Sequence, residues 1–502
     1  MNQLFAKKPL ELILEEMKGD NRLRRILGPV TLTSLGVGAI IGTGIFVLTG
    51  IAAHDKAGPA IMLSFVVSGL ACVFAALCYA EFASMVPVAG SAFTYAYATL
   101  GELFAWIIGW DLVLEYTVSS SAVAHGWSHY FQNFIGIFGV TIPKAFQRAP
   151  FDFDPSTGAF MSTGSQFDLP AIIIAFIVTI ILVKGIKESA WFNALMVGIK
   201  LTVVLLVIVL GAFYVNPENW KPFAPFGYSG FTFFGRTVWG EAVQGAPVGM
   251  LAAAAMIFFA YIGFDSVSTH AEEAKNPSKD VPIGIVASLI ICTVLYILVA
   301  AVLTGMVPSS QIDIDAPVAG AFMSLGLTWA QFIIALGAIA GITSVLLVMM
   351  LSQPRVLLAI ARDGFLPDSF FGAIHKKFRT PYKSTILTGF LVAAMAGFLP
   401  LRILAELVNI GTLFAFVVVC AAVLIMRRTH PEAKRPFRSP LFPVTPILGI
   451  LTCLMLMFSL PEENWLRLFI WLAIGLVIYF AYGRRHTVMH KILEAEKKKQ
   501  MK

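Results

Sequence analysis

The sequence predicts an all-α polytopic membrane protein with twelve transmembrane helices, ten of them arranged as an inverted repeat of five plus five. Only 13% of the 502 residues are charged and 58% are hydrophobic, whereas soluble domains carry about 25% charged residues. Apolar runs of about 20 residues, the length that spans a bilayer as a helix, recur along the whole chain. The first and sixth runs are interrupted at corresponding places, which indicates two broken helices and the inverted repeat.

The predicted spans are joined by short polar connections, except for two long segments that we place outside the cell, 131–168 and 216–246. We expect the first segment to be irregular and the second to cover the outer opening of the bundle. The spans are centred near Gly42, Cys72, Glu115, Ile177, Lys200, Gly263, Leu295, Val345, Phe390, Phe416, Leu451 and Ile474.

The first span, from about Val30 to Ala53, is interrupted near its middle by Gly42-Thr43-Gly44. A spanning helix tolerates such a break only where the freed backbone groups find partners in protein or in a water-lined cavity. The second half-helix then directs free N–H groups and a positive dipole end at an anion, while the carbonyls that end the first half suit a cation. One broken helix can therefore hold both ends of a zwitterion. The alternative is a glycine-rich packing face against a neighbouring helix.

The sixth span turns polar halfway along its length. Gly263 lies within its apolar run, and Asp265, Ser266 and Ser268 follow at once. The fifth span ends outside, so the sixth runs inward while the first runs outward. Interrupted helices at these two positions match an inverted repeat.

The charge distribution predicts the orientation of the chain. With the N-terminus in the cytoplasm and twelve spans, most of the 36 lysines and arginines fall on cytoplasmic segments, as the positive-inside rule requires. The net charge of +7 therefore follows from orientation and does not indicate a nucleic-acid partner. We predict a multi-pass protein of the cell membrane, plasma or inner, with both termini cytoplasmic and the lipid bilayer as its surroundings.

The predicted spans divide the chain into five parts. A basic cytoplasmic tail, 1–28, has no apolar core or cleavage site of a signal peptide. The two five-helix repeats cover 29–215 and 246–428, and the last two spans cover 440–484. The final part, 485–502, is a lysine-rich cytoplasmic tail that we expect to be disordered.

Two charged residues lie deep within predicted spans, where a charge is costly and usually functional. Lys200 is central in the fifth span, about ten residues or 15 Å from either end, too far for its side chain to reach an interface. It is a candidate for releasing and rebinding a proton, or for replacing a sodium ion at the carbonyls freed by the first break. Glu115 is central in the third span, where it either takes up a proton, holds water against a bound amine, or is a neutral structural acid.

Other polar residues carry weaker signals. His125 and His129 lie near the outer end of the third span and fit vestibule residues better than proton relays. The five cysteines sit in apolar spans without the spacing of metal ligands, so we expect neither a metal nor a disulfide. The chain also lacks a nucleophile constellation or a phosphate-binding loop, so an enzyme is not expected.

Three motifs carry a resemblance to a known family. They are Gly-Val-Gly-Ala-Ile-Ile-Gly-Thr-Gly-Ile-Phe at 36–46, Phe-Phe-Ala-Tyr-Ile-Gly-Phe-Asp at 258–265 with Glu-Glu-Ala-Lys-Asn-Pro at 272–277, and Arg-Asp-Gly-Phe-Leu-Pro at 362–367. With them the chain resembles the amino acid–polyamine–organocation (APC) superfamily over about residues 20–485. Within it, the chain is similar to the cationic amino acid transporters and their bacterial homologues.

The resemblance implies the leucine-transporter (LeuT-like) fold and proton-linked or exchange transport of L-amino acids, without a cofactor. It assigns the substrate carboxylate to the amides of Thr43 and Gly44. The α-amino group falls to carbonyls near the two breaks, and Met349 of the eighth span faces the substrate side chain or belongs to the core. Proton coupling is assigned to Lys200 and Glu115, and Glu115 is also a candidate substrate contact. The carbonyls implied for the α-amino group are those of Ile40, Phe259, Ala260 and Ile262.

We therefore predict a secondary-active L-amino acid transporter that couples uptake of small neutral amino acids to protons by alternating access. The pocket assembled from Ile40, Phe259 and Met349 is apolar, and burying a cationic side chain there without an anion is costly. The alternative within the class is an arginine or lysine carrier or exchanger, with Glu115 as the counter-charge. Amino acid sensors and channels form a different class, and a channel would need a continuous polar lining.

Overall fold

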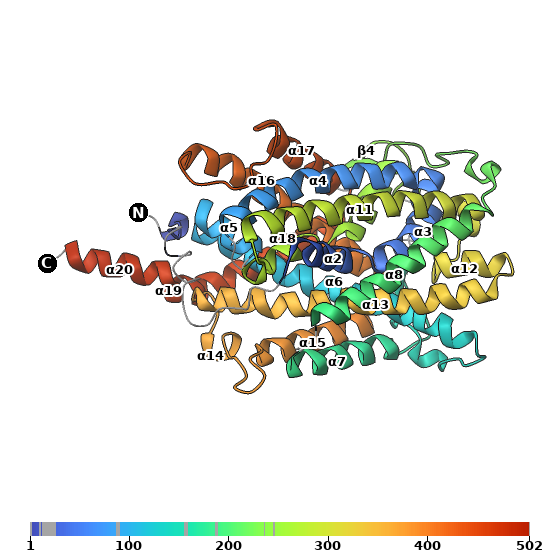
Figure 1. Ribbon diagram of the computed structural model, residues 1–502, viewed down its shortest axis with the longest axis horizontal. Coiled ribbons are helices and arrows are strands. Elements are labelled where there is room, and N and C mark those ends of the chain that lie inside the picture. The colour runs from blue at the N-terminus through green and yellow to red at the C-terminus, as the bar shows by residue number, and fades with distance from the viewer. Residues whose placement is uncertain are drawn as a thin grey trace.

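The computed structural model describes residues 3–9, 12, 27–86, 91–154, 159–185, 189–234, 236–243 and 246–500. Much of the predicted tail 1–28 thus lies outside the described residues. Long helices run side by side along the longest axis of an elongated bundle (Figure 1). This parallel arrangement is what a set of membrane-spanning helices requires.

The first half of the chain supplies the segments that we predicted as spans 1 to 5. The first of them is split into four short pieces, α2, η2, α3 and η3, whereas the others are continuous. In chain order the helices are η1 (Gln3–Phe5), α2 (Pro29–Ile40), η2 (Gly44–Leu48), α3 (Thr49–Ala52), η3 (Ala53–Ala57), η4 (Gly58–Ala60), α4 (Ile61–Met85), α5 (Ser91–Thr99), α6 (Glu102–Gly136), η5 (Lys144–Phe146), α7 (Leu169–Lys184), α8 (Ser189–Ala212) and η6 (Pro217–Trp220).

The second half repeats this design, because its first span is again split, into α9, η7 and α10. Short helices connect the longer ones at both ends of the bundle. The order is α9 (Met250–Ile257), η7 (Phe258–Tyr261), α10 (Ser266–Thr269), η8 (Ala271–Glu273), α11 (Pro277–Met306), η9 (Ser309–Gln311), α12 (Pro317–Ser324), α13 (Thr328–Arg362), α14 (Asp368–Phe371), α15 (Tyr382–Phe398), α16 (Leu401–Thr429), α17 (Val444–Phe458), α18 (Glu462–Ile478), η10 (Tyr479–Gly483), α19 (Arg484–His486) and α20 (Val488–Gln500).

In the described part of the chain, seven helical stretches are long and apolar enough to cross a membrane by length and composition. Four shorter apolar helices, α2, α7, α15 and α17, accompany them. Each predicted span centre falls in one of these stretches, in α6, or at the break that follows α2. The chain is therefore a multi-pass membrane protein, while the count of twelve crossings stays a prediction.

The two long external segments contain short strands. In the first, β1 (Phe151–Asp154) pairs with β2 (Ala159–Ser162) in an antiparallel hairpin, so the expectation of an irregular segment 131–168 was partly wrong. In the second, the pairs are β3 (Phe231–Phe233) with β4 (Arg236–Trp239) and β5 (Ala242–Val243) with β6 (Ala246–Pro247). The sequence of β1 alternates phenylalanine with aspartate, and Asp154-Pro155 and Gly158 are residue types that favour a turn between the strands.

The hairpin of β3 and β4 packs on the connection between α17 and α18. The Thr232 hydroxyl donates to the Leu460 carbonyl (3.2 Å) and also to that of Phe458. The Phe234 ring lies 4.8 Å from that of Trp465. This hairpin therefore packs on the last two helices through contacts between aromatic rings, and the expectation that segment 216–246 covers the opening of the bundle stays a prediction.

Both chain termini lie at the same end of the bundle (Figure 1). The Glu102 carboxylate, at the start of α6, accepts hydrogen bonds from Gln3, Tyr479 and Thr487 at 2.8 to 2.9 Å. The expectation of a disordered tail at 485–502 was wrong, because α20 continues to Gln500. Leucine, alanine, glutamate and lysine, which make up most of α20, are all good helix formers. Termini on one side agree with an even number of crossings.

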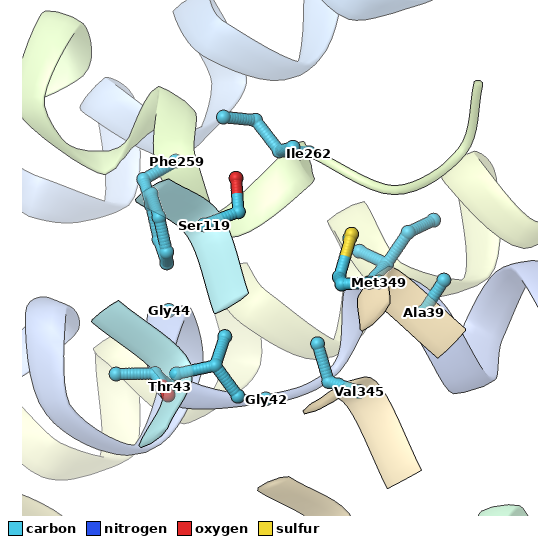
Figure 2. Close-up of a pocket in the computed structure, with 11 residues that line it drawn as sticks. Ala39, Gly42, Thr43, Gly44, Ser119, Phe259, Ile262, Val345 and Met349 are labelled. Carbon is cyan, nitrogen blue, oxygen red and sulfur yellow. The ribbon is translucent and has the colours of Figure 1, made fainter. Parts of the chain in front are cut away.

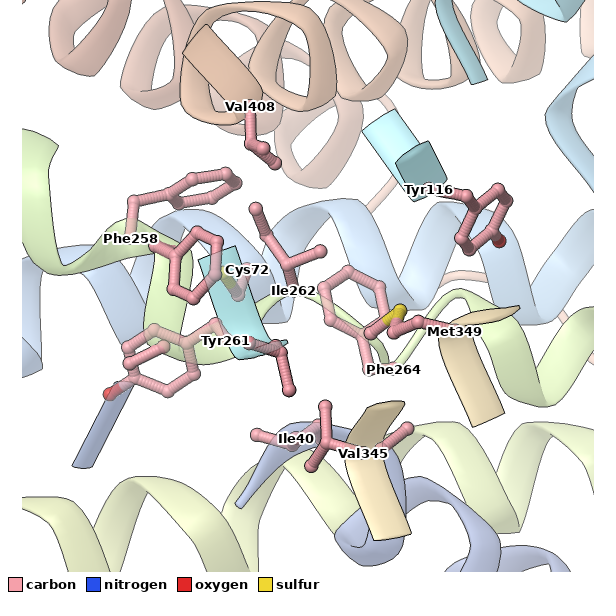
Figure 3. Packing of buried hydrophobic residues seen from close by; sticks show 14 of the residues in the cluster. Ile40, Cys72, Tyr116, Phe258, Tyr261, Ile262, Phe264, Val345, Met349 and Val408 are labelled. Atoms are coloured by element: carbon pink, nitrogen blue, oxygen red, sulfur yellow. The ribbon is translucent and has the colours of Figure 1, made fainter. Parts of the chain in front are cut away.

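Buried hydrophobic side chains pack the second break against its neighbours (Figure 3). The rings of Phe258 and Phe264 lie 5.7 and 5.0 Å from that of Phe416 in α16. Val408 of α16 and Met349 of α13 approach the same region. The break in the sixth span is therefore held by two long continuous helices, and its irregular backbone is covered by protein, as a membrane interior demands.

Candidate substrate site

The break in the first span lies at the predicted residues. Ile41 closes α2 by donating its N–H to the Val37 carbonyl (3.1 Å), and its ψ of 102° turns the chain out of the helix. The next segment begins with a hydrogen bond from the Phe46 N–H to the Gly42 carbonyl (3.3 Å). The amides of residues 43–45 precede that bond and have no partner within the helix. They are available to an anion.

The break in the sixth span is also at its predicted place. The chain leaves η7 at Ile262, whose ψ is 132°, and Gly263 then adopts a φ of 123°. The Asp265 carboxylate accepts the Gly263 N–H (3.3 Å) and the Tyr116 hydroxyl of α6 (2.8 Å). Asp265 therefore supports the turn and ties it to the third span.

The two breaks interlock through their glycines. A Cβ on Gly44 would lie 2.4 Å from the Cα of Ala260, and a Cβ on Gly263 would lie 2.8 Å from the Ala39 carbonyl oxygen. Both distances are shorter than any side chain allows, so each glycine lets the backbone of one span touch that of the other. For Gly263 the positive φ independently favours glycine.

Tyr296 of α11 joins the two breaks through its side-chain hydroxyl. Its hydroxyl lies 2.8 Å from the carbonyl oxygens of both Ile40 and Ala260. The ring is fully buried. A hydroxyl donates one proton at a time, and each carbonyl has two lone pairs. Both carbonyls, which the resemblance assigned to the α-amino group, therefore keep capacity for a second donor.

A small pocket lies where the breaks meet α6 and α13 (Figure 2). It encloses about 10 Å³, close to the smallest space that holds one water molecule. The hydroxyls of Thr43 and Ser119 are buried and have no hydrogen-bond partner among the described residues, an arrangement that calls for an absent polar group. The lining residues are Ala39, Ile40, Gly42, Thr43, Gly44, Ser119, Val123, Phe259, Ile262, Val345 and Met349.

Six of the eight predicted substrate residues line this pocket: Ile40, Thr43, Gly44, Phe259, Ile262 and Met349. Ala260 lies behind Gly44 and outside the lining. Glu115 is not part of the lining either, although it stands one helical turn from Ser119 on α6. The expected direct contact of Glu115 with substrate therefore has no support from the pocket geometry.

Sequence reasoning missed Ser119, Val123 and Val345 as lining residues. The missing signal was helical spacing, since residues four apart share one face of a helix. Ser119 follows Glu115 by four positions and Val123 follows Ser119 by four. Val345 precedes Met349 by the same interval. Extending Glu115 by two turns and Met349 by one turn would have found all three.

Lys200 is fully buried beside the end of α2. Its Nζ donates to the carbonyls of Gly38 (2.6 Å) and Ile41 (3.0 Å) and lies 3.4 Å from the Ser344 hydroxyl of α13. Lys200 thus binds the carbonyls freed by the break, as expected, and links α8 to α2 and α13. It does not line the pocket.

Glu115 belongs to a buried acidic group on the side of the pocket nearer the termini. Its carboxyl interacts electrostatically with Asp265 and Asp111 and by hydrogen bonding with the Thr412 hydroxyl of α16. Atoms Oε1 of Glu115 and both carboxyl oxygens of Asp111 are buried and lack hydrogen-bond partners within the described chain. Ionised carboxylates are costly to bury together without a cation, so this group is chemically suited to carrying a proton.

A larger cavity, of about 370 Å³, lies at the end of the bundle where α3 and α12 are found, remote from the termini (Figure 1). We call it the distal cavity. His125 and His129 line it, as expected for vestibule residues, and so does the hairpin of β1 and β2. Its lining residues are Ile51, Asp55, His125, His129, Arg148, Ala149, Phe151, Asp152, Met161, Thr163, Ile314, Asp315, Pro400, Leu401 and Arg402.

Broken helices that present free amides beside an apolar wall can accommodate an amino acid, and comparison with known proteins points the same way. The family model for amino acid permeases matches residues 27–481. The chain belongs to the amino acid permease family. The family and the relatives below place this permease in the APC superfamily, as its motifs predicted.

The permease is 47% identical to the branched-chain amino acid permease BcaP of Bacillus subtilis (strain 168), over 97% of this chain and 99% of that protein. It is 46% identical to the methylthioribose transporter of the same organism, over 98% of this chain and 100% of that protein. The vacuolar cationic amino acid transporter 4 of Arabidopsis thaliana is 39% identical, over 86% of this chain and 68% of that protein. These relatives are named for different substrates, so their similarity does not identify the substrate of this permease.

Proposed function

We propose that this permease couples the uptake of neutral aliphatic L-amino acids to protons, by alternating access around the pocket between the two breaks. The observation that carries this proposal is the juxtaposition of free amides at residues 43–45 with an apolar wall of Phe259, Ile262 and Met349. In this proposal the chain sits in the plasma or inner membrane with both termini cytoplasmic.

The carboxylate of the substrate is bound by the amides that follow the first break. The hydroxyls of Thr43 and Ser119, buried without partners among the described residues, add donors on the same side. Amides at a helix N-terminus bind an anion without any cationic side chain. The α-amino group is bound by carbonyls of Ile40, Phe259 and Ile262, where each helix unwinds. The carbonyl oxygens of Ile40 and Phe259 already accept one hydrogen bond each and keep a second lone pair for the amine.

The substrate side chain points toward Met349 and Val345. Both are apolar, so a neutral side chain is favoured over a cationic one, which would be buried without an anion. The similarity to a permease named for branched-chain amino acids supports this preference. The pocket encloses only about 10 Å³, so binding requires movement, and Met349 is the lining residue with the most flexible side chain.

The proton is carried by Lys200 or by the acidic group around Glu115. Lys200 occupies the carbonyls that a sodium ion would otherwise use, so a sodium gradient should not drive uptake. Glu115 would take part in proton coupling. Its carboxyl interacts with Asp265, which accepts the Tyr116 hydroxyl next to the second break. Because Glu115 does not line the pocket, we assign it to proton coupling before substrate binding.

The alternative is a cationic amino acid carrier or exchanger, which the resemblance to cationic transporters favours. It would need Glu115 to face the substrate as a counter-charge. A second alternative is transport of a thioether sugar, for which a methylthioribose transporter is the precedent. A thioether sugar has neither a carboxylate nor an amine, so it does not account for the pairing of free amides with carbonyls. A cationic amino acid shares that pairing, and what disfavours it is the apolar lining at Val345 and Met349.

Counterflow of labelled alanine in proteoliposomes tests the substrate class. We expect alanine, valine and leucine to compete, and arginine and methylthioribose to compete poorly. Strong competition by arginine would replace the proposal with the cationic alternative. Absence of counterflow for every amino acid, in protein that elutes as a single folded species, would favour a sensor over a transporter.

A further inference from the structure

A second cluster of polar side chains lies in the distal cavity, apart from the substrate pocket. His125 and His129 are one helical turn apart on α6, and their ring centroids lie 4.7 Å from each other. Asp168, which caps the N-terminus of α7, faces them. One ligand atom from each of the three residues can be chosen so that all lie within 4.8 Å of one another.

The Asp168 carboxylate is built to offer one oxygen to this cluster. Its Oδ1 accepts from the Ser128 hydroxyl (2.5 Å) and from the Ala171 N–H (3.1 Å). Its Oδ2 faces His125 Nδ1 at 3.1 Å and lacks a hydrogen bond of good geometry within the described chain. His125 Nδ1 also lies 3.3 Å from the Ala396 carbonyl oxygen, so Nε2 is the nitrogen that His125 would offer to a metal. Asp168 is fully buried, so Oδ1 fixes the carboxylate while Oδ2 is left for another partner.

His129 supplies the second observation. Neither of its ring nitrogens has a hydrogen-bond partner among the described residues, although both are buried. Leaving buried polar atoms unpaired is costly, and such atoms in a folded protein usually face a water or an ion. Asp315, which lies between η9 and α12, approaches to 3.6 Å from His129 Nδ1 and also pairs with Arg148.

We propose that His125, His129 and Asp168 bind a divalent transition metal, of which Zn²⁺ is the best match. Two imidazoles and one carboxylate are a ligand set of zinc, whereas Ca²⁺ and Mg²⁺ prefer oxygen ligands throughout. Zinc–ligand bonds are about 2.0–2.2 Å long, so the side chains must draw together slightly. The fourth position is taken by water or by Asp315. This reverses the expectation of no metal, which rested on the cysteines alone.

The metal would lie beyond the substrate pocket along α6 and on a different face of that helix, because residues two or six positions apart do not share a face. Val123 lines the pocket, and His125 and His129 follow it by two and six residues, a rise of roughly 3 to 9 Å along the helix. Recruitment of Asp315 would also tie the segment before α12 to α6 and α7. Bound Zn²⁺ should therefore slow uptake from this side without entering the pocket.

Calorimetric titration of the purified full-length protein with zinc chloride tests the proposal without any transport assay. We expect a single site of micromolar or tighter affinity. His129→Ala and Asp168→Asn should each weaken binding at least about tenfold, the smallest loss found even for outer-shell partners of metal ligands. Asn at 168 keeps the oxygen that caps α7, so the fold should survive.

His54→Ala is the matched control, because His54 is a partly exposed histidine outside the cluster, and binding should be unchanged. Zinc that binds the cluster variants as tightly as wild type, or fails to bind wild type, would overturn the site. If a variant elutes as an aggregate, the site is tested instead by adding Co²⁺ to the wild-type protein and recording its visible absorption. Absorption of a tetrahedral Co²⁺ complex that zinc displaces supports the site, and its absence contradicts it.

Discussion

Gly263 is the residue at which the two breaks depend most clearly on the absence of a side chain. Gly263→Ala would place a Cβ 2.8 Å from the Ala39 carbonyl oxygen at a φ of 123°. We expect the free energy of unfolding to fall by about 1–3 kcal/mol from the strained backbone conformation alone. We also expect alanine to bind more weakly. Thermal unfolding of the detergent-solubilised variant, with and without alanine, measures both effects.

Gly198→Ala is the control for this substitution. A Cβ on Gly198 meets nothing within 4 Å, and alanine favours the helix by about 0.8–1.0 kcal/mol over glycine. This variant should be as stable as the wild type or more so. Equal stability of both variants would mean that the second break does not need a glycine at 263.

Met349 tests the size of the pocket. Met349→Ser removes a flexible side chain from the lining and should admit longer substrates. Room for two more methylene groups, at about 0.8 kcal/mol each, would improve competition by leucine relative to alanine by roughly tenfold. Counterflow competition measures the ratio. Met323→Ser, on an exposed methionine of α12, is the control, and an unchanged ratio in both variants would exclude Met349 from the side-chain site.

At the residue scale, the sequence predicted the break residues because closely spaced glycines in the middle of an apolar run favour an interrupted helix. Ser119 and Val345 were missed because each is ordinary in a membrane helix. Helical spacing from Glu115 and Met349 places them on the same helix faces as those candidates, but which face of α6 and α13 meets the breaks depends on helix packing.

At the scale of elements, Tyr296 connects α11 to both breaks. Tyr296→Phe removes the hydroxyl shared by the Ile40 and Ala260 carbonyls, and a hydrogen bond contributes about 0.5–1.5 kcal/mol. We expect alanine to bind roughly two- to tenfold more weakly, as measured by its thermal stabilisation. Tyr479→Phe is the matched control, because its buried hydroxyl donates to the Glu102 carboxylate at the start of α6 (2.8 Å) and to neither break. Equal losses of binding would contradict a specific role for Tyr296.

Lys200 connects α8 to the end of α2. Lys200→Met keeps much of the side-chain length but leaves the Gly38 and Ile41 carbonyls without their donor, at a cost of about 1–3 kcal/mol for each buried group. We expect uptake of alanine to stop responding to a pH gradient, as measured with labelled alanine in proteoliposomes. Lys184→Met, on an exposed lysine that ends α7, should behave as wild type. An unaltered pH response in Lys200→Met would assign the proton to the acidic group around Glu115.

The elements themselves were well predicted, since every span centre falls in a helix or at a break. The failures lie outside the apolar runs. The strands of the external segments and the docking of β3 and β4 on the last two helices depend on long-range contacts of aromatic residues, such as Phe234 with Trp465. The helix α20 was mistaken for disorder because a lysine-rich composition fits both states.

At the scale of the whole molecule, the two ends of the bundle differ in character. The end with the termini is closed by buried polar contacts, including Lys8 Nζ with the Asp363 carboxylate at 2.6 Å. The other end contains the distal cavity, whose lining shares no residue with that of the substrate pocket. The pocket itself encloses too little space for an amino acid, so transport requires a change of shape that the interlocked breaks must share.

We propose that a proton gradient, and not a sodium gradient, drives uptake through this site. Labelled alanine should accumulate in proteoliposomes when the outside is more acidic than the inside at zero membrane voltage. Uptake should rise as the external pH falls, because the proton is co-transported. A sodium gradient at equal pH should produce no accumulation. Accumulation that requires sodium, or that ignores the pH gradient, would contradict the account.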